Sequence, residues 1–295
     1  MAVTPQMVKD LREKTGAAFG DAKKALDEVG GDMEKAIDWL REKGMAKAAK
    51  KSGRVAAEGM TWAVSNGTRG FVIEVNSETD FAAKNEAFSG FVKAVAQLGL
   101  EKGAADIEAV KALPMDGKTV ADRLVDLIAT IGENMTLRRA AKLEVTSGTV
   151  GSYIHMGGKI AVLTAIQASV EAPEVAKQVA MHVAASNPAA LDRTALDQTI
   201  LAREAAVFEA QAKESGKPAP VIEKMVQGRV NKFLQESCLV EQPFVMDPDR
   251  TVAKVVEEAS TGGKVSGFVR FGLGEGIEKE ASDFAAEVAA AVAAA

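Results

Sequence analysis

The sequence predicts an α+β protein with a small helical domain at its N-terminus and a core in which one α+β unit occurs twice. Apolar residues recur at helical spacing within residues 1–54. A strand–turn–strand–helix pattern then occurs twice, with an offset of about ninety residues. Aromatic residues make up 5% of the 295-residue chain, which is low for a protein rich in β-sheet. Helix is therefore expected to predominate, with two small antiparallel sheets.

Residues 1–54 are expected to form a compact unit of three helices. Thr4 and Pro5 provide an N-cap and a proline at the first helical position. Gly30 and Gly31 end the second helix, and Asp32 caps the third. The apolar stripe of the third helix contains Met33, Ala36, Ile37 and Leu40.

The end of this unit, residues 44–54, is basic, rich in small side chains and bounded by glycines. We interpret it as a solvated interdomain linker. An RNA-binding arm is the alternative, because clustered lysines also bind phosphate.

The duplicated core is expected to span residues 55–142 and 143–275. Asn66-Gly67 and Gly157-Gly158 lie at the tips of the two predicted hairpins, where a tight turn requires them. The predicted strands are 59–64 and 71–75 in the first copy, and 151–156 and 159–165 in the second. A further strand at 268–271 completes the second copy.

An insertion at about 189–236 interrupts the second copy. Residues 194–214 and 221–235 read as helices joined by a short turn, which predicts an antiparallel, coiled-coil-like hairpin. Such a hairpin either protrudes as an interaction surface or packs back on the core, and the sequence supports both interpretations.

The stretch Asn76–Phe88 places Phe81 where a β pattern changes to a helical one. Phe81, Phe88 and Phe91 share one helical stripe, so a single helix is expected to start near Phe81. Thr79 and Asp80 are suited to cap its first turn. Phe81 is then either the first buried residue of that helix or an exposed wedge that acts on a partner.

Composition excludes several classes of function. The net charge of −5 argues against broad binding to nucleic acid, and the single cysteine, Cys238, excludes an internal disulfide. The start of the chain has no apolar signal core, and no stretch is long enough to span a membrane, so a cytoplasmic protein is expected.

Catalytic and cofactor motifs are missing as well. His155 and His182 with one cysteine cannot form a His/Cys metal cluster, and no phosphate-binding loop of the G-x-x-x-x-G-K-[ST] type occurs. The glycine-rich run at 272–276 is interpreted as a turn. We therefore expect no cofactor, no metal and no bond-making chemistry, and a protein that works by contact.

The order of the motifs resembles the bacterial elongation factor Ts family, the guanine nucleotide exchange factors of elongation factor Tu. The match extends over essentially the full chain. It is carried by T-P-Q-M-V-K-D-L-R-E-K-T-G (4–16), G-D-M-E-K-A-I-D-W-L-R (31–41), V-N-S-E-T-D-F-A-A-K-N-E-A-F (75–88), Y-I-H-M-G-G-K-I-A-V-L (153–163), M-H-V-A-A-S-N-P (181–188) and Q-P-F-V-M-D-P (242–248).

The resemblance implies a wedge made of Thr79, Asp80 and Phe81. In the family, the Asp-Phe pair enters the nucleotide-binding domain of GDP-bound elongation factor Tu and disturbs its Mg²⁺ site and phosphate loop. GDP then leaves, and the factor is displaced from its nucleotide-free partner as GTP binds. The same resemblance implies weaker partner contacts by Arg12, Phe19 and His155, although Phe19 can also be a core residue.

The resemblance also implies that residues 1–54 form a ubiquitin-associated (UBA)-like domain and residues 276–295 a C-terminal helical module. The insertion resembles the long form of the family, for which self-association is one expected role. Ala82 and Ala161 depart from the common motif residues, a valine and a glycine, which bears on affinity.

Two functions of other classes remain open. One is an RNA-binding or ribosome-associated factor that uses Lys47–Arg54. The other is an adaptor that binds a ubiquitin-like protein through residues 1–54.

Overall fold

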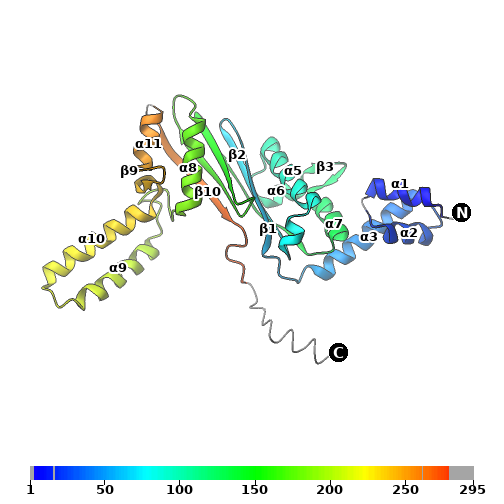
Figure 1. Ribbon diagram of the computed structural model, residues 1–295, viewed down its shortest axis with the longest axis horizontal. Coiled ribbons are helices and arrows are strands. Elements are labelled where there is room, and N and C mark those ends of the chain that lie inside the picture. The colour runs from blue at the N-terminus through cyan, green and yellow to red at the C-terminus, as the bar shows by residue number, and fades with distance from the viewer. Residues whose placement is uncertain (1–2, 16, 261, 279–295) are drawn as a thin grey trace.

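The computed structural model describes residues 3–15, 17–260 and 262–278. The molecule is elongated, with a three-helix domain at one end, a helical hairpin at the other and the α+β core between them (Figure 1). The predicted fold class is confirmed.

The N-terminal domain contains the three predicted helices: α1 (Pro5–Thr15), α2 (Phe19–Glu28) and α3 (Met33–Lys51). The Thr4 hydroxyl accepts from the Met7 N–H at 3.2 Å, and the Asp32 carboxylate accepts from the Lys35 N–H at 3.1 Å, as N-caps do. The small buried core consists of Val8, Leu11, Ala22, Ala25, Leu26 and Ala36.

The prediction of a linker at residues 44–54 is wrong, because α3 continues through most of this segment, to Lys51. Gly44 is buried, and a side chain there would meet the Cβ atom of Ala129 at 3.5 Å. At this point α3 packs on α7 (Val120–Ile131), and the alanines and lysines around Gly44 favour helix. A helix, rather than a flexible linker, joins the N-terminal domain to the core.

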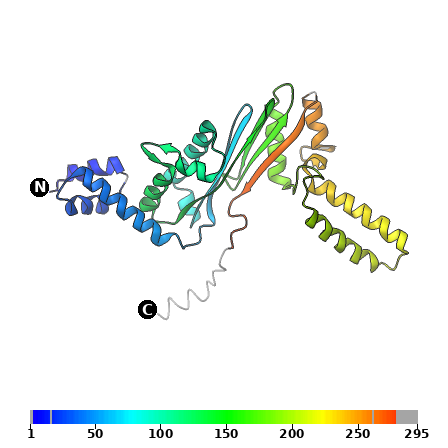
Figure 2. The ribbon, with the colours of Figure 1, turned by 180° about the vertical axis from the view of Figure 1, so that it is seen from behind.

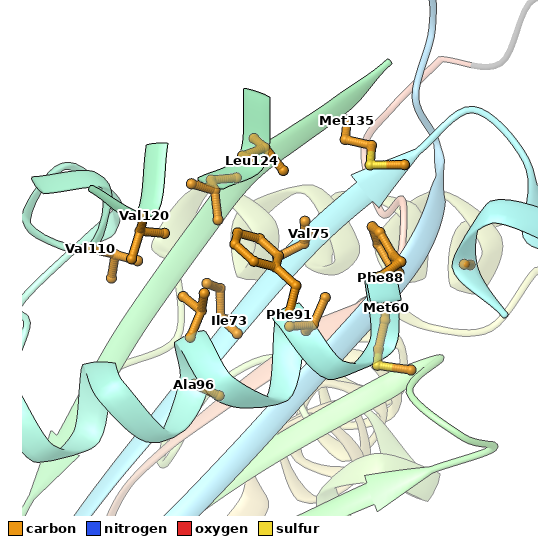
Figure 3. Packing of buried hydrophobic residues seen from close by; sticks show 14 of the residues in the cluster. Met60, Ile73, Val75, Phe88, Phe91, Ala96, Val110, Val120, Leu124 and Met135 are labelled. Atoms are coloured by element: carbon orange, nitrogen blue, oxygen red, sulfur yellow. The ribbon is translucent and has the colours of Figure 1, made fainter. Parts of the chain in front are cut away.

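The first half of the core is a three-stranded antiparallel sheet covered by helices on one face. Its strand order is β1 (Glu58–Asn66), β2 (Arg69–Ser77), β5 (Met135–Glu144). The helices are α4 (Asp80–Ala83), α5 (Glu86–Lys102), α6 (Ile107–Ala112) and α7. Figure 3 shows Phe88 and Phe91 of α5 directed at the sheet, where Ile73 and Val75 belong to the same buried cluster.

The second half repeats this plan. Its strand order is β10 (Lys264–Gly272), β7 (Ile160–Gln167), β6 (Gly148–His155), and α8 (Pro173–Ser186) and α11 (Val252–Ala259) cover the outer face. Gly59 and Gly148 hold equivalent places at the starts of β1 and β6, with φ of +126° and +116°. A Cβ atom at either would lie within 2.2 Å of a carbonyl oxygen on the neighbouring strand, so both copies require glycine there.

The two sheets pack face to face, so the core has four layers in the order helices, sheet, sheet, helices (Figure 2). The layer between the sheets is formed by Ala63, Val72, Val150, Ala161, Leu163, Ala165 and Phe271. Because β2 and β7 are central in their sheets and covered on both faces, they are buried along almost their whole length.

The hairpin consists of α9 (Gln198–Lys213) and α10 (Ala219–Ser237). The first helix starts four residues later than predicted, because Asp197 caps it by accepting from the Thr199 N–H. In both views the hairpin projects away from the core (Figures 1 and 2). Ala190, Leu196, Leu234 and Cys238 form a small cluster at its base.

Several elements had no predicted counterpart. They are β5, the helices α6, α7 and α11, the 3₁₀ turn η1 (Leu239–Glu241) and the short hairpins β3 (Pro114–Met115) with β4 (Lys118–Thr119) and β8 (Pro243–Phe244) with β9 (Asp247–Thr251). Strand β5 also runs across the boundary expected at 142/143.

Residues 273–276 form the expected turn. The C-terminal module expected at 276–295 lies almost wholly outside the described residues. Within the described part, no helix is both long and apolar enough to cross a membrane.

Candidate functional site

The segment expected to start one long helix forms two helices instead. Asp80 and Phe81 belong to the four-residue helix α4, and Asn85 then caps α5 by accepting from the Ala87 N–H at 2.8 Å. Thr79 is the N-cap of α4, and its hydroxyl accepts from the Ala82 N–H at 3.2 Å. The prediction of a single helix was wrong because Asn85 starts a new one with its own cap.

Phe81 is exposed, whereas the two residues that follow it are buried. The exposed fraction of Phe81 is 80%, against 4% for Ala82 and 8% for Ala83. The two alanines belong to the cluster beneath α5, so one face of α4 is fixed to the core. The opposite face presents an aromatic ring to solvent, and the interpretation of Phe81 as a buried residue is wrong.

Asp80 is paired with Lys84, one turn further along. The Lys84 Nζ atom lies 2.6 Å from Asp80 Oδ2 and 5.8 Å from the centroid of the Phe81 ring. The hydrogen bond from Lys84 is the main reason why the pKa of Asp80 lies below its ordinary value. Asp80 is therefore a carboxylate at neutral pH, and one cation contacts both members of the Asp80–Phe81 pair.

His155 lies at the same end of the core as α4. The turn that follows it, between β6 and β7, meets the start of β1: the Gly158 carbonyl accepts from the N–H and the hydroxyl of Thr61 at 2.8 and 2.9 Å. Helix α4 packs on the same strand. His155 itself is half-buried, with its Nδ1 atom 3.1 Å from the Tyr153 hydroxyl.

The remaining two predicted residues, Arg12 and Phe19, lie on the N-terminal domain, apart from Asp80 and Phe81. Arg12 donates from Nε to the Ala17 carbonyl at 3.2 Å and so ties down the loop that leads into α2. Phe19 is 56% exposed at the start of that helix, so it is not a core residue.

Two of the motifs contact each other through His182, which is buried in α8. Its Nδ1 atom accepts from the Val245 N–H at 3.1 Å, and its Nε2–H therefore donates to Gln242 Oε1 at 2.8 Å. Burial lowers the pKa of His182, and the Gln242 contact opposes this effect. His182 is thus a neutral structural residue.

The same contacts position Val245 and Met246, which are 50% and 55% exposed at the turn between β8 and β9. Neither residue was among the predicted site residues. The sequence did contain a signal for their exposure: two adjacent large apolar residues stand just before Asp247-Pro248. Asp-Pro favours a turn, and a turn exposes the residues beside it.

Large apolar side chains are exposed at Phe81, Phe19 and Met246. Among the described residues, no group of three or more histidine, cysteine, aspartate or glutamate side chains is placed to hold a metal ion. Ala82 and Ala161, the two departures from the motif, are both buried and cannot contact a partner directly.

Comparison with known proteins decides the family. The family model described as "Elongation factor TS" matches residues 78–275. The chain belongs to the elongation factor Ts family. The elongation factor Ts of Paramagnetospirillum magneticum is 55% identical over 302 residues, covering 98% of this chain and 96% of that protein. Those of Magnetococcus marinus and Gluconobacter oxydans are 53% and 55% identical, each covering at least 98% of both chains. The matches to these relatives extend over nearly the whole chain, and membership of the family assigns the chain to translation elongation.

Proposed function

We propose that this chain binds elongation factor Tu in its GDP-bound form and accelerates GDP release by inserting Asp80 and Phe81 into the nucleotide-binding domain. The observation that carries the proposal is the 80% exposure of Phe81 on a helix whose other face is buried. The Phe81 ring is exposed to solvent on a helix that is anchored to the core, and a large aromatic side chain in such a position is suited to burial in a partner.

The proposed mechanism is mechanical. An aromatic ring that enters a close-packed domain displaces whole elements, because packed interiors do not deform continuously. The displacement disturbs the Mg²⁺ site and phosphate loop of elongation factor Tu. Since the metal and backbone contacts hold the phosphates, their loss weakens GDP binding. No bond is made or broken by this chain.

Release of the factor follows from thermodynamic linkage. If the factor lowers the affinity for nucleotide, nucleotide lowers the affinity for the factor by the same ratio. GTP binding to the nucleotide-free complex therefore displaces the chain and completes the exchange. In this proposed role the chain acts in the cytoplasm, where translation elongation takes place.

Additional contacts are proposed for the exposed Arg12 and Phe19, for His155 beside the β6–β7 turn, and for the hairpin. Ile200, Val207 and Val221 are each more than 40% exposed on the hairpin. Apolar side chains exposed on a projecting arm support a contact role, which includes association with a second copy of the chain.

The function is tested by following the release of a fluorescent GDP analogue from elongation factor Tu after a chase with unlabelled nucleotide. The chain should accelerate release, and Asp80→Ala with Phe81→Ala should reduce that acceleration by about 10- to 100-fold, as for a buried aromatic hot spot. Val170→Ala is the matched control, because Val170 is a 56% exposed apolar residue outside the proposed contacts.

Absence of acceleration by the unaltered chain would overturn the proposed function. Acceleration that survives in a folded double variant would overturn the wedge while leaving the exchange activity in place.

A further inference from the structure

We propose that Glu133 is a positioning residue for the wedge: it fixes the N-terminus of α4 and thereby the direction in which Phe81 projects. The inference rests on the proposed function and adds a residue that the motif at 75–88 does not contain. Glu133 lies in the loop between α7 and β5, residues 132–134, which we call the brace loop.

The carboxylate of Glu133 makes two contacts with Thr79. Its Oε2 atom accepts from the Thr79 N–H at 2.9 Å, and its Oε1 atom accepts from the Thr79 hydroxyl at 2.6 Å. Hydrogen bonds to a carboxylate are stronger than those between neutral groups. Both hydrogen-bond donors of the N-cap residue, its N–H and its hydroxyl, are therefore held by one side chain that is 54 residues away in the sequence.

The contact also sets the direction of the Thr79 hydroxyl. Its hydrogen points to Glu133, so its lone pairs are free to accept from the Ala82 N–H at 3.2 Å. An ionised carboxylate only accepts, and so enforces this direction. Glu133 acts through Thr79 on the cap of the helix that carries Phe81.

A second contact of the brace loop, made by Asn134, holds Glu78, the residue before Thr79. The Glu78 carboxylate accepts from the Asn134 N–H at 2.5 Å, and the Asn134 side chain donates to the Arg54 carbonyl at 2.7 Å. Asn134 is 3% exposed. The brace loop thus holds two consecutive residues, Glu78 and Thr79, immediately before the wedge pair.

The wedge needs this support for two reasons. The pairing of β2 with β5 ends at Ser77 and Met135, so no strand hydrogen bonds fix the chain beyond that point. Helix α4 has four residues, too few to be stable by its own hydrogen bonds. Because Phe81 itself is exposed, its direction depends on Ala82 and Ala83 beneath the helix and on Glu133 at its start.

The geometric part of the inference is tested by amide hydrogen exchange on the full chain with Glu133→Gln. The Thr79 and Ala82 amides should exchange about tenfold faster, because the charged acceptor that orders both is lost. Amides of β2 and α5 should keep their rates. Glu101→Gln is the matched control, since among the described residues the Glu101 carboxylate accepts from the exposed Gln97 side chain alone. Unchanged rates at Thr79 and Ala82 would overturn the inference whether or not the chain promotes nucleotide exchange.

The functional part is tested by a double-mutant cycle in the GDP-release assay. Glu133→Gln should lower the maximal acceleration at saturating factor by about tenfold, and should have no further effect in a Phe81→Ala background. A general folding defect would lower the activity equally in both backgrounds. An equal loss of acceleration in the unaltered and Phe81→Ala backgrounds, or no loss in either, would overturn the positioning role. Failure of the unaltered chain to accelerate GDP release would instead count against the proposed function.

Discussion

Phe81 and Phe88 stand seven residues apart in one apolar stripe of the sequence, yet their environments are opposite. Phe88 is fully buried between α5 and the first sheet, whereas Phe81 is 80% exposed (Figure 3 shows Phe88). The spacing of apolar residues indicates which side chains share a helical face, but not whether another element covers that face.

At the residue scale, we expect truncation of these two side chains to have very different effects on stability. Phe81→Ala should change the free energy of unfolding by no more than about 0.5 kcal/mol, because the ring contacts little of the protein. Phe88→Ala should lower it by about 3–5 kcal/mol, through lost transfer energy and the cavity left behind. Urea unfolding of both variants measures the contrast. A large loss of stability in Phe81→Ala would show that the ring supports the fold.

The two histidines differ in burial and in role, although they are the same residue type and both lie within motifs. His155 and His182 both occur within motifs, but one is half-buried beside an exposed turn and the other is buried between α8 and the segment 242–245. Their roles depend on partners 2 and 60 residues away.

At the element scale, α5 has one glycine on its buried face, where a side chain has no room, and another on its solvent face, where a side chain would meet nothing. Gly99 faces Phe71 of β2, and a Cβ atom there would lie 2.5 Å from the Phe71 ring. Gly90 lies on the solvent face, and a Cβ atom there would meet nothing within 4 Å. The helix approaches the sheet closely only because position 99 has no side chain.

These two glycines give a matched pair of substitutions. Gly99→Ala should lower the free energy of unfolding by about 1–3 kcal/mol, because the buried Phe71 ring must shift in a packed core. Gly90→Ala should raise it by about 0.5–1 kcal/mol, because alanine is the better helix former. Thermal unfolding followed by circular dichroism tests both, and destabilisation by Gly90→Ala would contradict the assignment of the two faces.

At the scale of the whole molecule, Glu74 ties the two halves of the core together. It is fully buried on β2 and accepts from Arg138 at 2.9 Å, Arg139 at 2.6 Å and the Gly274 N–H at 2.8 Å. Burial by itself would raise the pKa of Glu74, but these donors and Asn76 outweigh it and leave the pKa below its ordinary value. The carboxylate thereby joins the first sheet to the segment that follows the last strand of the second.

The sign of this pKa shift predicts how stability depends on pH. A lowered pKa in the folded state gives stability that is present above the unfolded value, near 4.5, and is lost as the pH falls through the folded value. Glu74→Gln should lower the free energy of unfolding at pH 7 by about 3–5 kcal/mol, since two arginines lose their carboxylate. The difference from the unaltered chain should shrink as the pH falls below the ordinary value.

Glu144→Gln is the control, because the Glu144–Lys142 pair on β5 is exposed and contributes at most about 1 kcal/mol. Urea titrations over a range of pH measure all three proteins. A difference between Glu74→Gln and the unaltered chain that does not depend on pH would contradict an ionised role for Glu74.

The sequence by itself determined those elements whose signals are local. The caps at Thr4 and Asp32, the turn glycines of the two hairpins and the repeated strand–turn–strand–helix pattern need only a few neighbouring residues to be recognised. The same holds for the place of Asp80 and Phe81, the proposed wedge pair, at the junction of a strand and a helix.

Only the tertiary structure decided which surfaces are covered and which distant residues meet. The packing of α3 on α7 joins residues far apart in the sequence. The third strand, β5, is charged and alanine-rich, so it becomes recognisable only beside β2. The contact of Glu133 with Thr79 and that of Glu74 with Gly274 join residues 54 and 200 positions apart. Such contacts leave no periodic or turn signal in the sequence, because their geometry is set by the packing of whole elements.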